Sequence, residues 1–429
     1  MLKRLKKRIS ESDFLKSLTV LITGTIVAQA VGYALAPIIT RLYTPEEIGE
    51  FALFQRIVIL IATIATARYE LALPLPKKEF EAFQLFRFSL KLVIITTLIS
   101  ALSLITLGLY NGYALDYYFV TILGIVSVFS LAFFNLGTNW AIRIKSFKTI
   151  SLSKMTNSIS NNGFRVIMGI FNWGYIGLVI SFVISCIVGA SHFFGTYLKT
   201  KTSSKLNSNE QKDGKIARAY KDFPLVSLPH ALSDVLRDVL VAFIIIELFS
   251  ENVFGSFDHS FRMLRLPIMI IGASMSQIFF NRISDYKKNE IPIYPLFRKL
   301  LITLFLISII PFALIYFFGG EIFSFVFGNE WYLSGKLSEI MAPWLMLNFI
   351  LSPLSTIPLV FNKQKSFFIL GLTASLLQLI GFIFLPHMFA EQLYTVFQLV
   401  TWSQVFISIV ILFYLNTLVK KHDQLSSLT

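Results

Sequence analysis

The sequence predicts an all-α, polytopic membrane protein of about 12 transmembrane helices, arranged as two six-helix pseudo-symmetric lobes around a central cavity. The composition is the first reason: 55% of the residues are hydrophobic, 14% are charged and the mean hydropathy is +0.69. The second reason is the length of the apolar segments. Many nearly uncharged segments exceed the roughly 18 residues that a helix needs to cross the hydrocarbon core. These runs are continuous, whereas a membrane β-barrel shows alternating segments of about 10 residues. Helices are therefore the predicted spanning elements.

An internal repeat is the third observation. The segment Leu42–Phe51 recurs as Leu248–Phe257 at an offset of 206 residues, and the match includes Gly49 with Gly255. Self-similar segments about half a chain apart are typical of a duplicated architecture. We therefore expect an N-terminal six-helix lobe over 1–200 and a C-terminal six-helix lobe over 222–429. The polar, lysine-rich segment 201–221 between them is predicted to be a flexible cytoplasmic linker.

The apolar runs give the spans in chain order. We expect them at about 14–40, 47–72, 80–109, 116–142, 149–171, 174–198, 222–249, 252–281, 293–318, 332–360, 366–386 and 392–418. With this assignment 26 Lys and Arg residues fall in connections on one side, and the other side has Arg41 and Lys336. Cytoplasmic loops carry the excess of basic residues, so both termini are predicted to be cytoplasmic. The net charge of +14 is explained in this way, without nucleic acid as a partner.

Four arginines within the predicted spans are candidate substrate-binding cations of the cavity: Arg56, Arg237, Arg262 and Arg265. A lipid-facing charge costs about 2.5–3.5 kcal/mol at a helix centre, which favours an interior position. Arg56 and Arg262 are equivalent in the repeat, so they would face one another across the axis of the lobes. Guanidinium binds phosphate bidentately and stays charged, which points to an anionic substrate.

Helical spacing places several carboxylates beside these cations. Asp258, Arg262 and Arg265 share one face by i, i+4 and i+7 spacing, and Asp234 and Asp238 flank Arg237. The alternative interpretation is therefore internal pairing of Arg237 with Asp234 and of Arg262 with Asp258. The candidates for ion coupling or ion pairing are Arg68, Glu70, Asp234, Asp238 and Asp258.

Motifs of catalysis and cofactor binding are missing from the sequence. It contains no P-loop, no H-E-x-x-H and no C-x-x-C, and Cys186 is its single cysteine. The longest predicted outward loop, about 319–331, is too short for a catalytic domain. We therefore expect a protein that is not an enzyme, with no metal and no cofactor, although coupling to a H⁺ or Na⁺ gradient fits the membrane carboxylates.

The start of the chain resembles the Wzx-type polysaccharide-repeat flippases of the multidrug/oligosaccharidyl-lipid/polysaccharide exporter (MOP) superfamily. The resemblance is carried by Leu35–Glu70, with Pro37, Leu42–Pro45, Gly49 and the run Arg68–Ala72, and by Phe327–Trp331 in the second half. It implies two lobes that open alternately to each side of a bacterial inner membrane. It further implies that the cargo is a polyprenyl-diphosphate-linked oligosaccharide, moved from the cytoplasmic to the outer leaflet for O-antigen, capsule or exopolysaccharide assembly. The partners would be that glycan, the lipid bilayer and a polysaccharide polymerase or ligase.

Other functions remain open at this point. A multidrug or small-solute exporter of the same architecture would take cationic cargo, and the intramembrane arginines argue against it. A membrane polymerase or ligase would need a larger outward loop. A peptidoglycan-precursor flippase typically has two more spans.

Overall fold

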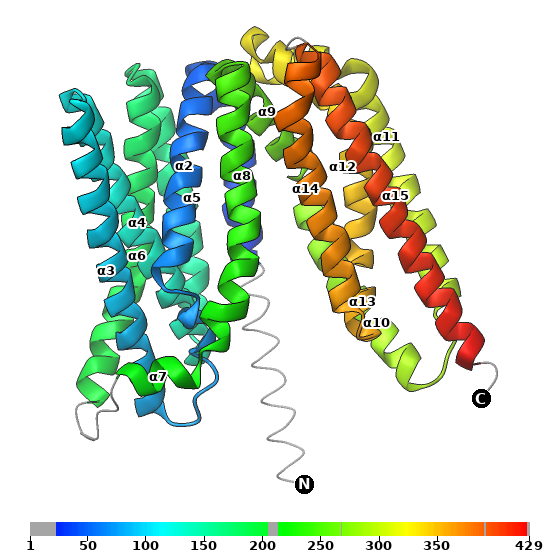
Figure 1. Cartoon of the computed structure of the whole chain (residues 1–429), viewed down its shortest axis with the longest axis horizontal. Coiled ribbons are helices and arrows are strands. Elements are labelled where there is room, and N and C mark those ends of the chain that lie inside the picture. The colour runs from blue at the N-terminus through cyan, green and yellow to red at the C-terminus, as the bar shows by residue number, and fades with distance from the viewer. Residues whose placement is uncertain (1–22, 205–212, 267, 390–391, 427–429) are drawn as a thin grey trace. The chain divides into compact units, whose positions relative to one another are not determined.

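The structure is a computed structural model that describes residues 23–204, 213–266, 268–389 and 392–426 (Figure 1). Every regular element in these ranges is a helix. The chain divides into two compact units: Met1–Tyr43 with Glu50–Val239, and Thr44–Gly49 with Leu240–Thr429. This division falls inside the helix Leu228–Leu248, whereas the sequence suggests a boundary at the polar segment 201–221.

The first unit consists of long helices joined by short turns. It contains the helix Thr23–Leu42, most of α2 (Pro45–Ala65), the 3₁₀ turn η1 (Tyr69–Ala72), α3 (Glu79–Asn111), α4 (Leu115–Arg143), α5 (Phe147–Ile170), α6 (Gly174–Ser204), α7 (Asp213–Ala219), the π-helical turn η2 (Phe223–Ser227) and the first part of α8 (Leu228–Leu248). Its core is aromatic: Phe86 packs edge-on against Trp140 with ring centroids 5.4 Å apart, and both rings are buried.

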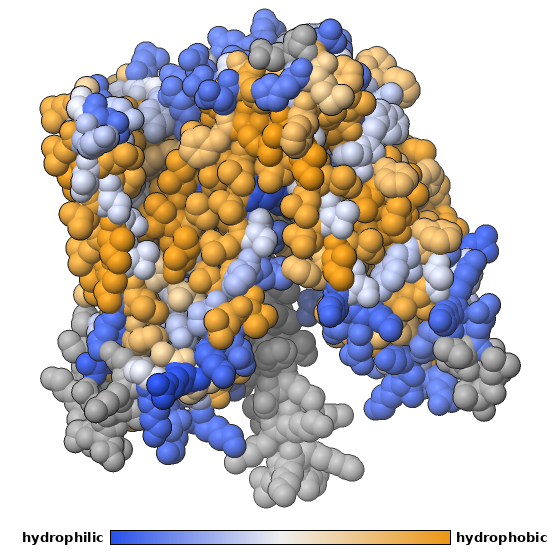
Figure 2. Space-filling view, viewed as in Figure 1, coloured by the Kyte–Doolittle hydropathy of each residue, from blue (hydrophilic) through white to orange (hydrophobic). Residues whose placement is uncertain are grey.

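The second unit repeats this pattern of long helices. It contains the end of α8, α9 (Glu251–Leu264), the π-helical turn η3 (Ile268–Gly272), α10 (Ala273–Lys288), α11 (Tyr294–Phe327), the 3₁₀ turn η4 (Asn329–Trp331), α12 (Tyr332–Leu354), α13 (Ile357–Val360), α14 (Gln364–Met388) and α15 (Leu393–Ser426). Helix α12 lies centrally and packs against α9, α11 and α15. Within each unit, apolar residues cover the sides of the helices and hydrophilic residues gather at their ends (Figure 2).

The repeat in the sequence is also a repeat in structure. Thr44 caps α2, where its hydroxyl accepts from the Glu47 amide and the Glu47 carboxylate accepts from the Thr44 amide. These two bonds form a capping box. Its counterpart Ser250 caps α9, because its hydroxyl accepts from the Val253 amide at 3.2 Å. The two copies therefore begin their helices in the same way.

The equivalent glycines of the two copies touch, backbone against backbone, within the second unit. A Cβ atom on Gly255 would lie 1.7 Å from the carbonyl oxygen of Pro45, and one on Gly49 would lie 2.2 Å from that of Glu251. No side chain fits at either position. The first turn of α2 can approach α9 this closely because both residues are glycine.

Twelve long helical segments in the described ranges correspond to the twelve expected spans. In those ranges, ten are long and apolar enough to cross a membrane. The other two are α5, which is rich in Ser, Thr and Asn, and α8, which carries Asp234, Arg237, Asp238 and Glu247.

Several expected boundaries were wrong. The second span ends at Ala65 instead of reaching residue 72, because the backbone turns left-handed at Ala67 and Arg68. The expected loop 319–331 is largely helical, since α11 continues to Phe327 past a kink at Phe318. The Gly320 amide beyond the kink donates to Glu339 on α12, which is also paired with Lys336.

The described part of the expected linker is also more ordered than its composition suggests. Helix α6 extends to Ser204, residues 205–212 lie outside the described ranges, and α7 then forms a helix. Ile216 of α7 is buried in the same cluster as Tyr69, Phe86 and Trp140. The short helix is docked by Ile216, by Ala217 packed beside the cluster and by a hydrogen bond from the Tyr69 hydroxyl to the Ala217 carbonyl. These contacts are too few to give the segment a recognisable apolar periodicity.

Candidate functional site

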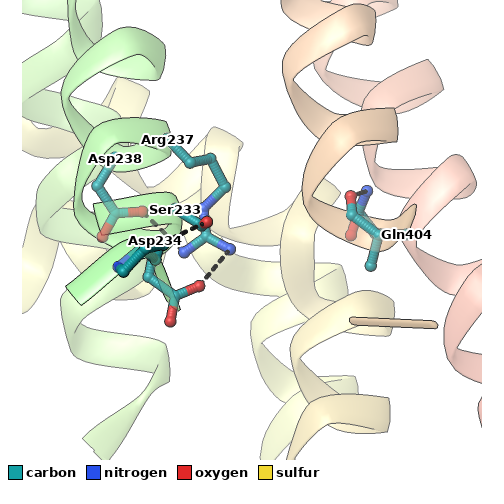
Figure 3. Close-up of polar contacts among 7 residues, drawn as sticks. Ser233, Asp234, Arg237, Asp238 and Gln404 are labelled. Atoms are coloured by element: carbon teal, nitrogen blue, oxygen red, sulfur yellow. Dashed lines mark hydrogen bonds and ion pairs between the residues drawn. The ribbon is translucent and has the colours of Figure 1, made fainter. Parts of the chain in front are cut away.

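Four of the predicted site residues come together in the first unit, where α2 lies beside α8. Arg56 donates from Nη1 to the backbone carbonyl of Asp238 at 3.2 Å, which ties α2 to α8. Arg237 donates from Nε and Nη2 to Oδ1 of Asp238 at 3.1 and 2.9 Å. Its Nη1 lies 3.9 Å from Oδ1 of Asp234 (Figure 3). We call Arg56, Asp234, Arg237 and Asp238 the α2–α8 cluster.

The helix geometry explains the cluster. Asp234, Arg237 and Asp238 occupy positions i, i+3 and i+4, so their side chains project from one face of α8. The carboxylates of Asp234 and Asp238 are 61% and 51% exposed, whereas the Arg237 side chain is 28% exposed. The sequence prediction of an Arg237–Asp234 pair is therefore refined, because the shorter contact is with the adjacent Asp238. The two cations of the cluster are balanced by its two anions.

The remaining predicted cations lie on α9 in the second unit. Arg262 forms an ion pair with Asp258 one helical turn earlier, as the pairing interpretation expects. Asp258 is nearly buried, with a side chain 10% exposed, while that of Arg262 is 39% exposed. Arg265 follows the last residue of α9, and its guanidinium lies over the Phe261 ring at 5.0 Å from the centroid. The expected opposition of Arg56 and Arg262 across an axis remains a prediction.

Arg68 and Glu70 lie apart from these cations, in the turn between α2 and α3. Nη1 of Arg68 is 3.5 Å from Oε1 of Glu70. Thr66 donates its hydroxyl to the other carboxylate oxygen. The predicted pair is thus formed, in a connection outside the apolar spans.

Sequence reasoning gave no role to two cations on α5. Arg165 is 8% exposed, its guanidinium lies over the ring of Phe51 at 4.7 Å, and its carbonyl accepts from the hydroxyl of Tyr43. Lys154 donates to the hydroxyl of Thr25 at 3.4 Å. The signal available in the sequence was the low hydropathy of 149–171, which marks a helix whose polar groups need protein partners.

The match to known families decides the identity. The model of a family described as polysaccharide biosynthesis protein matches residues 38–335, well over half of the chain. The chain belongs to the polysaccharide biosynthesis protein family. No curated protein sequence matches it.

Solved structures show the same fold. An inward-facing multidrug resistance MATE family transporter of the MOP superfamily superposes with a TM-score of 0.70 at 15% identity, over 93% of this chain and 99% of that one. The lipid II flippase MurJ in an inward closed conformation gives a TM-score of 0.69 at 15% identity, over 94% and 90%. A MOP superfamily transporter from Pyrococcus furiosus, described as having a binding pocket of reverse polarity, gives 0.60 at 14% identity, over 95% and 96%.

The fold of this polysaccharide biosynthesis protein is similar to that of solved transporters and flippases such as the MATE transporter and MurJ. The protein is a multi-pass membrane protein, because ten helices in its described ranges are long and apolar enough to cross a membrane.

Proposed function

We propose that this protein is a flippase for polyprenyl-diphosphate-linked oligosaccharide repeat units, which it moves from the cytoplasmic to the outer leaflet of a bacterial inner membrane by alternating access. The α2–α8 cluster carries this proposal, because it presents guanidinium groups on two of the membrane helices of a polysaccharide biosynthesis protein. The lipid II flippase among the structural relatives shows that the same fold serves for a lipid-linked substrate.

The chemistry of the cluster suits a diphosphate headgroup. Arg237 already holds a carboxylate oxygen through two N–H groups, which is the fork geometry that also suits phosphate. A diphosphate would displace the half-exposed Asp238 from Arg237 at small cost, because exposed ion pairs contribute about 0–1 kcal/mol. Arg56 is anchored to a backbone carbonyl through Nη1, which positions its guanidinium beside α8.

The energy source and the cellular partners complete the proposal. We expect transport to be coupled to a H⁺ or Na⁺ gradient, and the flipped glycan to pass to a polysaccharide polymerase or ligase outside the membrane. The orientation with both termini in the cytoplasm follows the distribution of basic residues.

The test is the leaflet location of polyprenyl-diphosphate-linked repeat units in cells that lack the protein. Accumulation on the cytoplasmic leaflet, reversed by wild type and not by Arg56→Ala, supports the flippase. Arg282→Ala is the matched control, because Arg282 is an exposed arginine on α10 of the second unit. Accumulation on the outer leaflet would contradict the proposal in favour of a polymerase or ligase. An unchanged distribution with altered drug susceptibility would favour a multidrug exporter.

A further inference from the structure

A buried carboxyl group lies in the connection between α2 and α3. Glu70 is 3% exposed and belongs to η1, which packs against α3, α4 and η2. The connection lies outside the apolar spans, which end at Ala65 and resume at Glu79. An isolated buried carboxylate is unstable unless its partners compensate its charge.

The negative charge of the Glu70 carboxylate is only partly compensated by its neighbours. Thr66 donates its hydroxyl to Oε2, and Arg68 Nη1 lies 3.5 Å from Oε1, which is longer than a hydrogen bond between charged groups. Nε of Arg68 is buried and has no hydrogen-bond partner. Burial raises the pKa of Glu70, and the Thr66 hydroxyl, the Glu70 backbone amide and the Arg68 charge each lower it by less. The neutral acid is therefore favoured more than in water.

Other charges do not alter this balance. Charged residues on the packed elements include Glu79, Glu81, Arg87 and Lys91 on α3, Arg143 on α4, Asp213, Lys215 and Arg218 on α7, and Asp222 beside η2. None of them adds a resolved effect at Glu70, where the charge that acts is Arg68. Arg143 donates to the carbonyls of Leu73 and Pro76 at 3.0 and 2.8 Å, so it holds the following loop instead.

The ion pair coincides with a strained backbone. Ala67 and Arg68 have φ angles of 48° and 62°, the left-handed region that residues with a Cβ rarely adopt. Such strain persists where surrounding contacts hold it. Here the contacts are the Arg68–Glu70 pair and the Tyr69 hydroxyl, which donates to the carbonyl of Ala217 on α7.

We propose that Glu70 is a proton-binding site, and that loss of its proton loosens the left-handed turn at the end of α2, because burial of the resulting charge costs more than its ion pair with Arg68 returns. The proton comes from the aqueous phase and binds a carboxylate oxygen. Arg68 keeps its charge in both states, so release of the proton leaves a buried carboxylate whose charge is only partly compensated. The role of this site in coupling transport to a H⁺ gradient rests on the proposed flippase function, whereas proton binding itself is independent of the cargo.

The first experiment measures protonation directly. The full-length protein in lipid nanodiscs is titrated while the infrared band of protonated carboxyl groups is followed. We expect a component with a midpoint above that of an ordinary glutamate, lost in Glu70→Gln and kept in Glu81→Gln. Glu81 is a matched control because it is partly exposed and paired with Lys78 at 3.5 Å. A titration without a component that Glu70→Gln removes would overturn the proposal.

The neighbours of Glu70 provide a second test that does not depend on the folding of Glu70→Gln. Arg68→Ala removes the stabilising charge, so the midpoint should rise by about one pH unit or more. Thr66→Val should shift it in the same direction. An unchanged midpoint in both variants would show that the titrating group is elsewhere.

A thiol probe tests whether the turn loosens. Leu75 in the following loop is 59% exposed, and Cys186, the single native cysteine, is buried. We expect maleimide to label Leu75→Cys several-fold faster as the pH rises through the Glu70 midpoint, relative to the denatured protein at the same pH. The same probe in Glu70→Gln should show no pH dependence. A pH dependence that persists in Glu70→Gln contradicts the switch, and neither readout requires transport of the glycan.

Discussion

The contact between the first turn of α2 and α9 predicts that Gly255→Ala is strongly destabilising. The added methyl group would lie 1.7 Å from the carbonyl oxygen of Pro45 and 2.8 Å from the amide nitrogen of Gly49. Real Cβ contacts essentially never fall below 3.0 Å, so the two helices must separate by more than about 1 Å. The obstructing atoms belong to the backbone, so no rotamer change can relieve the clash.

The loss of stability caused by the clash can be isolated by comparison with a second helical glycine that has free space around it. Gly371 lies inside α14 with no atom within 4 Å of its Cβ position. Replacing glycine by alanine inside a helix stabilises it by roughly 0.5–1 kcal/mol, and this gain is common to both variants. The difference between them therefore reports the clash, which for overpacking is about 1–3 kcal/mol or more.

The assay is reversible denaturation of the purified full-length protein in mixed micelles, which gives the free energy of unfolding. We expect the free energy of unfolding of Gly371→Ala to equal or exceed that of wild type. The free energy of unfolding of Gly255→Ala should be lower than that of Gly371→Ala by the cost of the clash. Gly49→Ala should behave like Gly255→Ala, because its methyl group would meet the carbonyl of Glu251 at 2.2 Å. Equal stability of Gly255→Ala and Gly371→Ala would refute the reasoning.

Three further predictions concern charged groups. Arg56→Ala and Arg262→Ala should each reduce glycan flipping roughly 10- to 100-fold without loss of membrane insertion, as expected for one charge-assisted contact, and Lys should restore activity in part. A double alanine variant as active as wild type would exclude both residues from binding. Arg143→Met should destabilise the protein by about 2–3 kcal/mol and speed trypsin cleavage at Lys77 and Lys78, since it removes three hydrogen bonds to the loop. Because burial raises the pKa of Glu70 above 4.5, wild type should lose stability as the pH rises from 4.5 through that raised pKa, whereas Glu70→Gln should lack this slope in denaturation measurements.

Most of the fold could be predicted because it depends on properties that are local in the sequence. Continuous apolar runs locate helices, and the repeated turn at Thr44 and Ser250 marks equivalent helix starts through the same capping chemistry. The end of α2 was missed because the left-handed turn at Ala67 and Arg68 has no glycine to signal it. The continuation of α11 to Phe327 was missed because Glu339, a residue on another helix, binds the amide freed by the kink.

The candidate site was predictable in part for a similar reason. Spacing along one helix identified the partners of Arg237 and Arg262, which lie on the same helix as the arginines. The contact of Arg56 with the Asp238 carbonyl joins residues 182 positions apart, and no local pattern encodes it. Arg165 was overlooked because its partner is the ring of Phe51, which in the sequence is one aromatic residue among many.

The polar character of α5 has a consequence for how the protein enters the membrane. Three of its side chains form hydrogen bonds with α6: Ser153 with the Gly189 carbonyl, Thr156 with His192 and Asn157 with the Ser185 carbonyl. Helix α6 follows α5 in the chain, so these partners do not yet exist when α5 leaves the ribosome. In lipid the Asn157 side chain would then lack this partner, and an unpaired buried amide costs a few kcal/mol. We therefore expect α5 to enter the bilayer together with α6, as a helical hairpin, instead of by itself.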